Sequence, residues 1–334
     1  MTRHVVFVVH PDYAHYVEQV SALLVARGVR VETLWVTEAG AEVERLAASS
    51  LVVTVHSVRA DVARLMSDLK GRTPTLTLQD GVIEHRHANH EAAGGVLRYR
   101  PLHTDQIAVF GARSAGLLRS FGVSPDRIAV TGSCRIGWDD PVRKPPADGY
   151  LLITAANRPA FDLAGTAAFY RALDRILVAC GEQGVPFRLR LSRGVNEKGG
   201  LCRIGLVRDQ LPPELVRRFR ATPVSTDSLA DDLRGARAAL TTPSTVTLEA
   251  MAAGVPVGHI EFDDDTAFLH PAWRVRQDTD VAAVIRDMMA PSDLKMMYQD
   301  CLLRENLEPG DSAERIVRHM ERMMADPQRA FAAR

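Results

Sequence analysis

The feature that most constrains the fold is a regular alternation of short apolar runs with longer segments of helical periodicity. The apolar runs are rich in valine, isoleucine and leucine, which is typical of buried parallel strands. We expect strands at residues 4–9, 29–36, 51–55, 74–79, 106–110, 128–131, 150–154 and 187–191. An alternation of this kind predicts α/β domains built on parallel sheets.

The alternation is interrupted at residues 80–97, a polar stretch rich in His and Gly that we expect to be a long loop, and again at residues 139–149, where prolines and mixed charges are typical of a linker. We therefore expect a Rossmann-like domain at 1–140, a linker at 141–149, a second Rossmann-like domain at 150–311, and a C-terminal segment at 312–334. The amphipathic helix of that last segment is a candidate to pack back on the first domain. Ligands of such sheets bind outside the carboxyl ends of the strands. Two facing domains would place the site in the cleft between them.

The composition narrows the class of protein. Lys plus Arg and Asp plus Glu both number 41, and this balance argues against a general nucleic-acid binder. The four cysteines, Cys134, Cys180, Cys202 and Cys301, form no CxxC pair, as expected for unpaired thiols in a reducing cytoplasm. No apolar run approaches the roughly 18 residues of a membrane span. We expect a cytoplasmic protein with at most peripheral contact at the inner membrane.

Residues 238–257 carry the strongest local pattern in the chain. They predict a short strand, a Thr-Thr-Pro-Ser turn, a helix, and a Gly-Val-Pro break into another strand. We expect Thr242 to cap the helix and Pro243 to occupy its first position, where the missing N–H costs nothing.

The residues after this cap suit a nucleotide. The free amides of Ser244 and Thr245, with the helix dipole, would bind a phosphate. Thr245 and Glu249 are four residues apart and share a helix face, so the carboxylate is placed to accept hydrogen bonds from ribose hydroxyls. The alternative is a capped core helix on which Glu249 is solvated.

Asp80 is the candidate for chemistry. It directly follows the strand expected at 74–79 and precedes Gly81, so its carboxylate would lie at the carboxyl end of a strand. That position suits a nucleophile or a general base. Glu84 and His85 are close enough in the sequence to orient it or to titrate with it. The alternative is an ordinary Asp-Gly turn.

A metal site has less support. His85, His87 and His90 lie in one loop without the spacing of a helical zinc motif. Residues 263–265 are three aspartates that lack the calcium-loop pattern. We expect no metal and no cofactor.

Several polar and basic residues follow other expected strands, where their amides and cations could hold an anion. Individually each is also a candidate hinge or surface residue. Together with a helix N-terminus they would neutralise a phosphate leaving group without metal. They are Ser133, Arg135, Asn157, Arg158 and Arg193.

These blocks resemble a known fold family. Residues 243–257 resemble the donor-binding segment of GT-B glycosyltransferases, and residues 106–135 are similar to bacterial surface-polysaccharide transferases, which include capsule enzymes and teichoic-acid glycerophosphotransferases. Leu78-Gln-Asp-Gly-Val82 looks like the Glu-Asp-Gly-Phe motif of retaining β-Kdo transferases, with Gln79 and Val82 in place of Glu and Phe.

The resemblance implies an α/β protein of the GT-B fold, with two facing Rossmann-like domains and an interdomain cleft. It implies that Asp80 attacks the anomeric carbon of a CMP-activated sugar, that Glu249 binds the ribose, and that Ser244 and Thr245 hold the phosphate. The expected activity is metal-independent transfer from a nucleotide-sugar donor, with CMP-Kdo favoured, to a glycan or lipid-linked glycan acceptor. The expected process is capsule or lipopolysaccharide O-antigen assembly.

Three alternatives stay open. Many polysaccharide transferases carry a histidine where Asp80 stands, as a base for inverting displacement, so the stereochemistry is not assigned. A UDP-sugar 2-epimerase of the same fold would convert its donor without an acceptor. A non-catalytic nucleotide- or sugar-binding assembly protein would bind without turnover.

Overall fold

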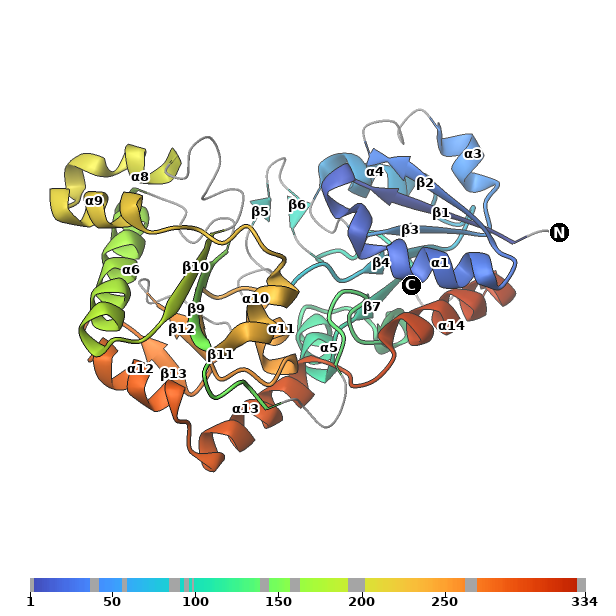
Figure 1. Ribbon diagram of the computed structural model, residues 1–334. Helices are drawn as coiled ribbons and strands as arrows, with labels where there is room; N and C mark the ends of the chain where they lie inside the picture. The colour runs from blue at the N-terminus through green and yellow to red at the C-terminus, as the bar shows by residue number, and fades with distance from the viewer. Residues whose placement is uncertain are drawn as a thin grey trace. The chain divides into compact units, whose positions relative to one another are not determined.

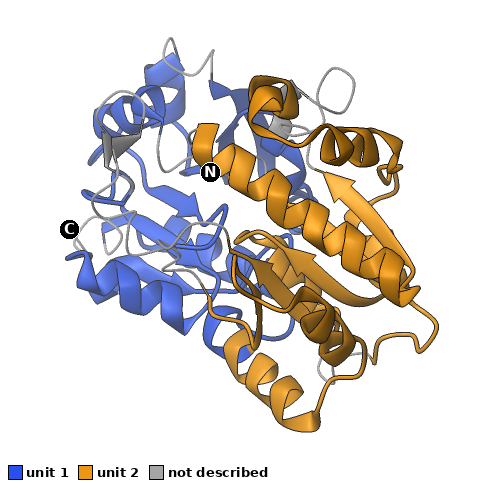
Figure 2. Cartoon of the chain, turned by 90° about the vertical axis from the view of Figure 1, so that its left-hand side faces the viewer, with its two compact units in different colours: residues 1–140, 304–334 blue, residues 141–303 orange. Residues whose placement is uncertain are grey.

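The chain forms two compact units, each an α/β structure with its own parallel sheet (Figure 2). The computed structural model describes residues 3–36, 42–55, 59–83, 91–92, 96–97, 99–138, 144–156, 163–191, 202–261 and 269–328. Unit 1 comprises residues 1–140 and 304–334, and unit 2 comprises residues 141–303. The sequence placed the end of the second domain at 311, whereas the chain returns to unit 1 at Arg304, within a helix.

Unit 1 is built on six parallel strands in the order β2-β1-β3-β4-β7-β8 (Figure 1). Every expected strand is present in the two units, with each end within one residue of the expected bound. The strands of unit 1 are β1 (His4–Val9), β2 (Arg30–Trp35), β3 (Leu51–Thr54), β4 (Thr75–Leu78), β7 (Gln106–Val109) and β8 (Ile128–Val130). A separate antiparallel pair is formed by β5 (Glu91–Ala92) and β6 (Val96–Leu97).

Alternate residues of β1 supply the two faces of this sheet. Val5 and Phe7 pack into the core beneath α1 and α14, whereas Val6 and Val8 pack beneath α3 and α4. A strand that is buried on both faces has a continuous apolar sequence, and β1 could be predicted for this reason. The helices of unit 1 are η1 (Pro11–Tyr16), α1 (Glu18–Ala26), α3 (Val43–Ala47), α4 (Ala60–Asp68), α5 (Ala112–Ser120), η4 (Pro125–Arg127) and α14 (Ser312–Ala325).

The C-terminal helix α14 completes the core of unit 1. Its buried face contributes Ile316, Val317 and Met320 to the same cluster as β1. On its surface, Arg27, which directly follows α1, bonds to Glu314 at 2.5 Å and to Glu321 at 2.8 Å. These exposed pairs fix the orientation of the helix more than they add stability.

Unit 2 is built on five parallel strands in the order β10-β9-β11-β12-β13. The strands are β9 (Tyr150–Ala155), β10 (Phe187–Leu191), β11 (Ala236–Thr241), β12 (Val257–Ile260) and β13 (Trp273–Val275). One face packs against α6 and α12 through a large apolar cluster. The helices are α6 (Leu163–Gln183), α8 (Cys202–Leu206), η5 (Arg208–Gln210), α9 (Pro213–Ala221), α10 (Leu229–Gly235), α11 (Val246–Ala252), α12 (Val281–Met289) and α13 (Asp293–Asn306).

The return of the chain to unit 1 requires a glycine. A Cβ on Gly111, at the start of α5, would lie 2.5 Å from the carbonyl carbon of Asn306 and 2.8 Å from the amide nitrogen of Leu307. Both contacts are with backbone, which cannot move aside as a flexible side chain would. Gly111 therefore marks a close approach of two segments distant in sequence.

We predict that Gly111→Ala lowers the free energy of unfolding of unit 1 by about 1–3 kcal/mol, the usual cost of overpacking. Gly116→Ala is the matched control in the same helix. Its nearest neighbour would be 4.0 Å away, and Gly→Ala within a helix is neutral or stabilising. Urea unfolding followed by circular dichroism measures both. Equal midpoints for the two variants would contradict the predicted clash.

Candidate functional site

The carboxyl edge of the unit 1 sheet is organised by the buried side chain of Gln79, which is 2% exposed. Its Nε2 donates to the carbonyl oxygen of Gly81 at 2.7 Å, and its Oε1 accepts from the amide of Phe110 at 2.9 Å. Its own amide donates to the carbonyl of Ala108 at 3.0 Å. One side chain thereby joins the ends of β4 and β7 and fixes the turn that follows β4. Asp80 lies within this turn, partly exposed, at the carboxyl end of β4.

Ser133 and Arg135 lie at the same edge, after β8. Ser133 is buried, and its hydroxyl oxygen accepts from the amides of Arg135 at 3.2 Å and Ile136 at 3.3 Å. Nη1 of Arg135 donates to the Tyr16 hydroxyl at 2.7 Å, and the guanidinium lies 5.1 Å from the centroid of the Tyr16 ring. Ser133 thus shapes the turn, and Arg135 is a half-buried, positioned cation.

In unit 2, the prediction that Thr242 caps the helix after β11 is wrong. Helix α11 begins at Val246 and its N-cap is Thr245, so Thr242 and Pro243 lie in a bend before the helix. The physical reason is a tertiary bond: the Thr242 hydroxyl accepts from the amide of Ala156 at 2.7 Å. Thr242 is almost fully buried and ties the end of β11 to the end of β9.

The bend presents the remaining candidates at the carboxyl end of β11. Ser244, Thr245 and Glu249 are all partly exposed. Among the residues that the structure describes, the amides of Ser244, Thr245 and Val246 donate to no backbone carbonyl. The amide of Glu249 bonds to the carbonyl of Thr245 at 3.2 Å, so the two residues lie one turn apart on the same side of α11. This arrangement can offer N–H donors to an anion and a carboxylate beside it.

A residue that sequence reasoning missed holds α11 in place. His259 of β12 is fully buried, and its Nε2 lies 3.0 Å from Oγ1 of Thr247 in α11. Burial, with a smaller contribution from His270, lowers the pKa of His259 to about 3. The ring is therefore neutral at physiological pH. The bond fixes the helix that carries Glu249 against the sheet.

Five predicted site residues lie outside the described part of the chain. They are Glu84, His85, Asn157, Arg158 and Arg193. His87, His90 and residues 263–265 lie outside it as well. Among the described residues, no group of three His, Cys, Asp or Glu side chains could hold a metal ion. In the same residues, no helix is long and apolar enough to cross a membrane.

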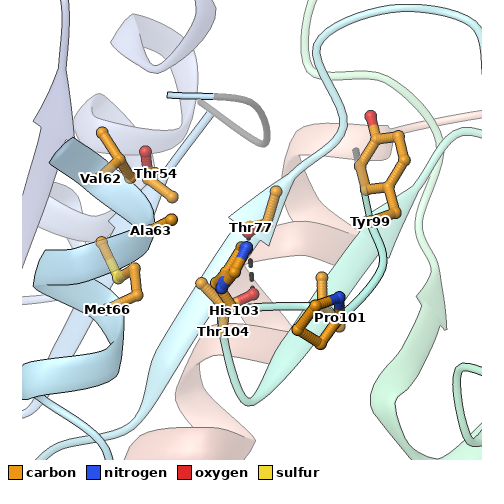
Figure 3. Close-up of a pocket in the computed structure, with 10 residues that line it drawn as sticks. Thr54, Val62, Ala63, Met66, Thr77, Tyr99, Pro101, His103 and Thr104 are labelled. Carbon is orange, nitrogen blue, oxygen red and sulfur yellow. Dashed lines mark hydrogen bonds between the residues drawn. The ribbon is translucent and has the colours of Figure 1, made fainter. Parts of the chain in front are cut away.

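Unit 1 also contains a small cavity beside β4 (Figure 3). Its lining includes Thr54, Thr77, His103 and Thr104. Its volume of about 10 Å³ is enough for about one water molecule. Burial and the nearby Arg127 lower the pKa of His103. The cavity is too small for a nucleotide and belongs to the core.

Comparison with known proteins supports the fold. No protein-family model and no curated protein matches the chain. MnaA of S. aureus, solved with UDP, is similar with a TM-score of 0.64, 14% identity, and coverage of 97% of both chains. The UDP-GlcNAc 2-epimerase of Methanocaldococcus jannaschii, solved with UDP-GlcNAc and UDP, has a TM-score of 0.64 and 12% identity, over 96% of this chain and 100% of that chain. The wall teichoic acid polymerase TagF has a TM-score of 0.60 and 12% identity, over 97% and 90%.

These similarities and the two parallel-sheet units define a protein of the GT-B fold, which confirms the expected fold class. Sequence identities of 12–14% assign the fold alone, because proteins of one fold can have different activities. The resemblance to β-Kdo transferases stays a prediction.

We predict that Gln79→Glu destabilises unit 1 by about 1–3 kcal/mol, because an ionised carboxylate cannot donate to the partly buried carbonyl of Gly81. The matched control is Gln19→Glu, on the exposed face of α1, which should unfold with the wild type. Urea unfolding measures both variants. A Gln79→Glu midpoint equal to that of the wild type would show that the Gly81 bond contributes nothing.

We predict that His259 adds a pH dependence to the stability of unit 2. The unfolded imidazole binds a proton near its ordinary pKa of 6.5, whereas the folded one stays neutral down to about 3. The contribution of His259 is therefore fully present above pH 6.5 and is lost as the pH falls toward 3, by up to about 1.4 kcal/mol per pH unit.

The measurement compares wild type with His259→Asn by urea unfolding at several pH values in that range. Subtracting the variant removes the contribution of the carboxylates that both proteins share. The stability advantage of the wild type should shrink as the pH falls. A constant difference would show that His259 does not titrate as predicted.

Proposed function

We propose that this chain is a glycosyltransferase that moves a sugar from a nucleotide-activated donor to a glycan acceptor, with Asp80 as its nucleophile or base. The observation that carries the proposal is the Gln79 bridge, which fixes the turn containing Asp80 at the carboxyl end of β4. A carboxylate on a rigid turn, at the edge where α/β sheets bind ligands, suits covalent or general-base catalysis.

We assign donor binding to the turn between β11 and α11. The amides of Ser244, Thr245 and Val246 are suited to a phosphate, and Glu249 one turn further is suited to ribose hydroxyls. The bond between Thr242 and Ala156 keeps this turn in one conformation. In support, the structural neighbours were solved with UDP, with UDP-GlcNAc, or after a soak with CDPG.

For the chemistry, we propose that Asp80 attacks the anomeric carbon as the nucleotide phosphate leaves. The acceptor hydroxyl then attacks the same carbon, the bond from that carbon to Asp80 breaks, and the hydroxyl proton is released to solvent, which restores the free carboxylate. If Asp80 acts as a base, it takes the acceptor proton in a single displacement. Arg135, a positioned cation at the same sheet edge, is assigned to the phosphate of the donor. The remaining predicted site residues keep the roles that the sequence suggested. We assign Glu84 and His85 to orienting Asp80 or titrating with it. We assign binding of the donor phosphate to Asn157, Arg158 and Arg193.

The donor that we favour is CMP-activated Kdo, because Leu78-Gln-Asp-Gly-Val82 resembles the motif that carries the nucleophile of β-Kdo transferases. The acceptor would be a glycan of a capsule or lipopolysaccharide. A thermal-shift screen of CMP, CDP, UDP and GDP tests the nucleotide. A ligand at one hundred times its dissociation constant stabilises the protein by about 2.7 kcal/mol.

A second candidate is a UDP-sugar 2-epimerase. It is favoured by the TM-score of 0.64 to the M. jannaschii UDP-GlcNAc 2-epimerase, against 0.60 to TagF. NMR of the protein with a UDP-sugar and no acceptor separates the two functions. Conversion of the sugar under those conditions would replace the transferase proposal.

We predict that Asp80→Asn keeps the nucleotide-induced thermal shift and lowers transfer by at least about a thousandfold, the scale at which loss of a nucleophile is felt. The matched control is Asp126→Asn, an exposed acid of unit 1, which should be fully active. Radiolabelled donor and purified acceptor measure transfer. Full activity of Asp80→Asn would remove Asp80 from the mechanism.

A further inference from the structure

Helix α13 carries an apolar stripe on its exposed face. Leu294, Met297 and Tyr298 are 76%, 65% and 44% exposed, and Cys301 is exposed as well. Their spacing of three, four and seven residues places them on one side of the helix. We refer to these four residues as the α13 stripe. Single exposed apolar residues are ordinary on protein surfaces, but a continuous stripe marks an interaction site.

The opposite side of α13 is firmly anchored in unit 2. The buried side chain of Gln299 donates to the carbonyl of Val255 at 3.0 Å and accepts from the amide of Val257 at 2.9 Å. On the stripe itself, the Tyr298 hydroxyl donates to the carbonyl of His270 at 2.8 Å, which holds that side chain in place. Figure 1 shows α13 at the outer edge of its unit, beyond α12 and β13. The stripe is therefore a rigid surface that would lose little entropy on binding.

We propose that the α13 stripe binds the same stripe of a second copy of this chain, with the two helices antiparallel. The spacing of the stripe is symmetric about a point between Met297 and Tyr298. A twofold axis at that point sets Leu294 against Cys301 of the second copy, and Met297 against its Tyr298. Isologous contacts of this kind require a self-complementary surface, which this spacing provides.

The charges at the ends of the helix fit the same arrangement. Asp293 and Arg304 are both exposed and lie on the same flank of the stripe, near its two ends. In the antiparallel pair, the axial offset between Asp293 and Arg304 of the second copy is about 3 Å, two residues of helical rise. Arg304 is also held in place, 5.3 Å from the centroid of the Trp138 ring. The pairing therefore places opposite charges together at both ends.

The same charges disfavour a lipid surface as the occupant. Helices that lie on membranes have basic polar faces. Helix α13 instead carries more acidic than basic side chains, namely Asp293, Asp300 and Glu305 against Lys295 and Arg304.

One pair of helices buries less than the roughly 1,200 Å² of a standard stable interface, so we expect a weak, concentration-dependent dimer. Sedimentation velocity of the full chain, from about 1 to about 200 µM, should show it with a dissociation constant on the order of 10 µM. Met297→Glu sets two carboxylates beside the axis and should raise that constant at least about tenfold. Leu206→Glu is the matched control, because Leu206 is also 65% exposed but lies in α8.

A cross-link tests the register. Leu294→Cys should form a disulfide-linked dimer under mild oxidation, and the additional change Cys301→Ser should abolish it. Thermal unfolding by circular dichroism confirms that each variant is folded. The proposal is overturned by a wild type that is monomeric at 200 µM, by a Met297→Glu dimer of unchanged affinity, or by a cross-link that persists without Cys301. Monomeric protein bound to anionic phospholipid vesicles would also overturn it.

Discussion

The amide side chain of Gln79 is the interaction on which the candidate site of unit 1 depends. A strand that leaves a sheet exposes backbone groups that the ladder no longer satisfies, and buried groups of this kind need partners. Gln79 supplies both an acceptor, for the amide of Phe110, and a donor, for the carbonyl of Gly81. A side-chain amide offers both, with its oxygen as the acceptor and its NH₂ group as the donor. The conformation around Asp80 is thus set both by a bond within the turn and by a bond to the end of the neighbouring strand β7.

Unit 2 uses the same principle with different residues. Thr242 ties the loop after β11 to the end of β9, and Thr247 ties α11 to His259 of β12. In each case a short polar side chain connects a segment at the carboxyl edge to a neighbouring strand of the sheet. The polar groups that we assign to the donor, on Ser244, Thr245 and Glu249, are carried by the segment that these bonds hold. A binding site needs this support, because a displacement of about 1 Å in a catalytic group costs activity.

The sequence was informative where the signal is local and less so where it is not. Strands such as β1 were predictable because burial on both faces leaves a continuous apolar run. The expected cap at Thr242 was wrong because capping preference is a local rule, and the hydroxyl bonds instead to Ala156, 86 positions away. His259 gave no signal, since a single histidine in an apolar strand does not reveal a partner on another element. The return of the chain at Arg304 was misplaced because α13 continues without a break across the boundary.

The position of α14 in the chain has a consequence for synthesis. Unit 1 is discontinuous, with all of unit 2 encoded between β8 and α14. Ile316, Val317 and Met320 fill the core beneath β1, so the nascent first segment keeps that apolar surface uncovered while more than a hundred further residues are translated. Unit 2 is contiguous and can fold as it emerges. The core of the amino-terminal unit can therefore be completed only after the whole of unit 2 has been synthesised.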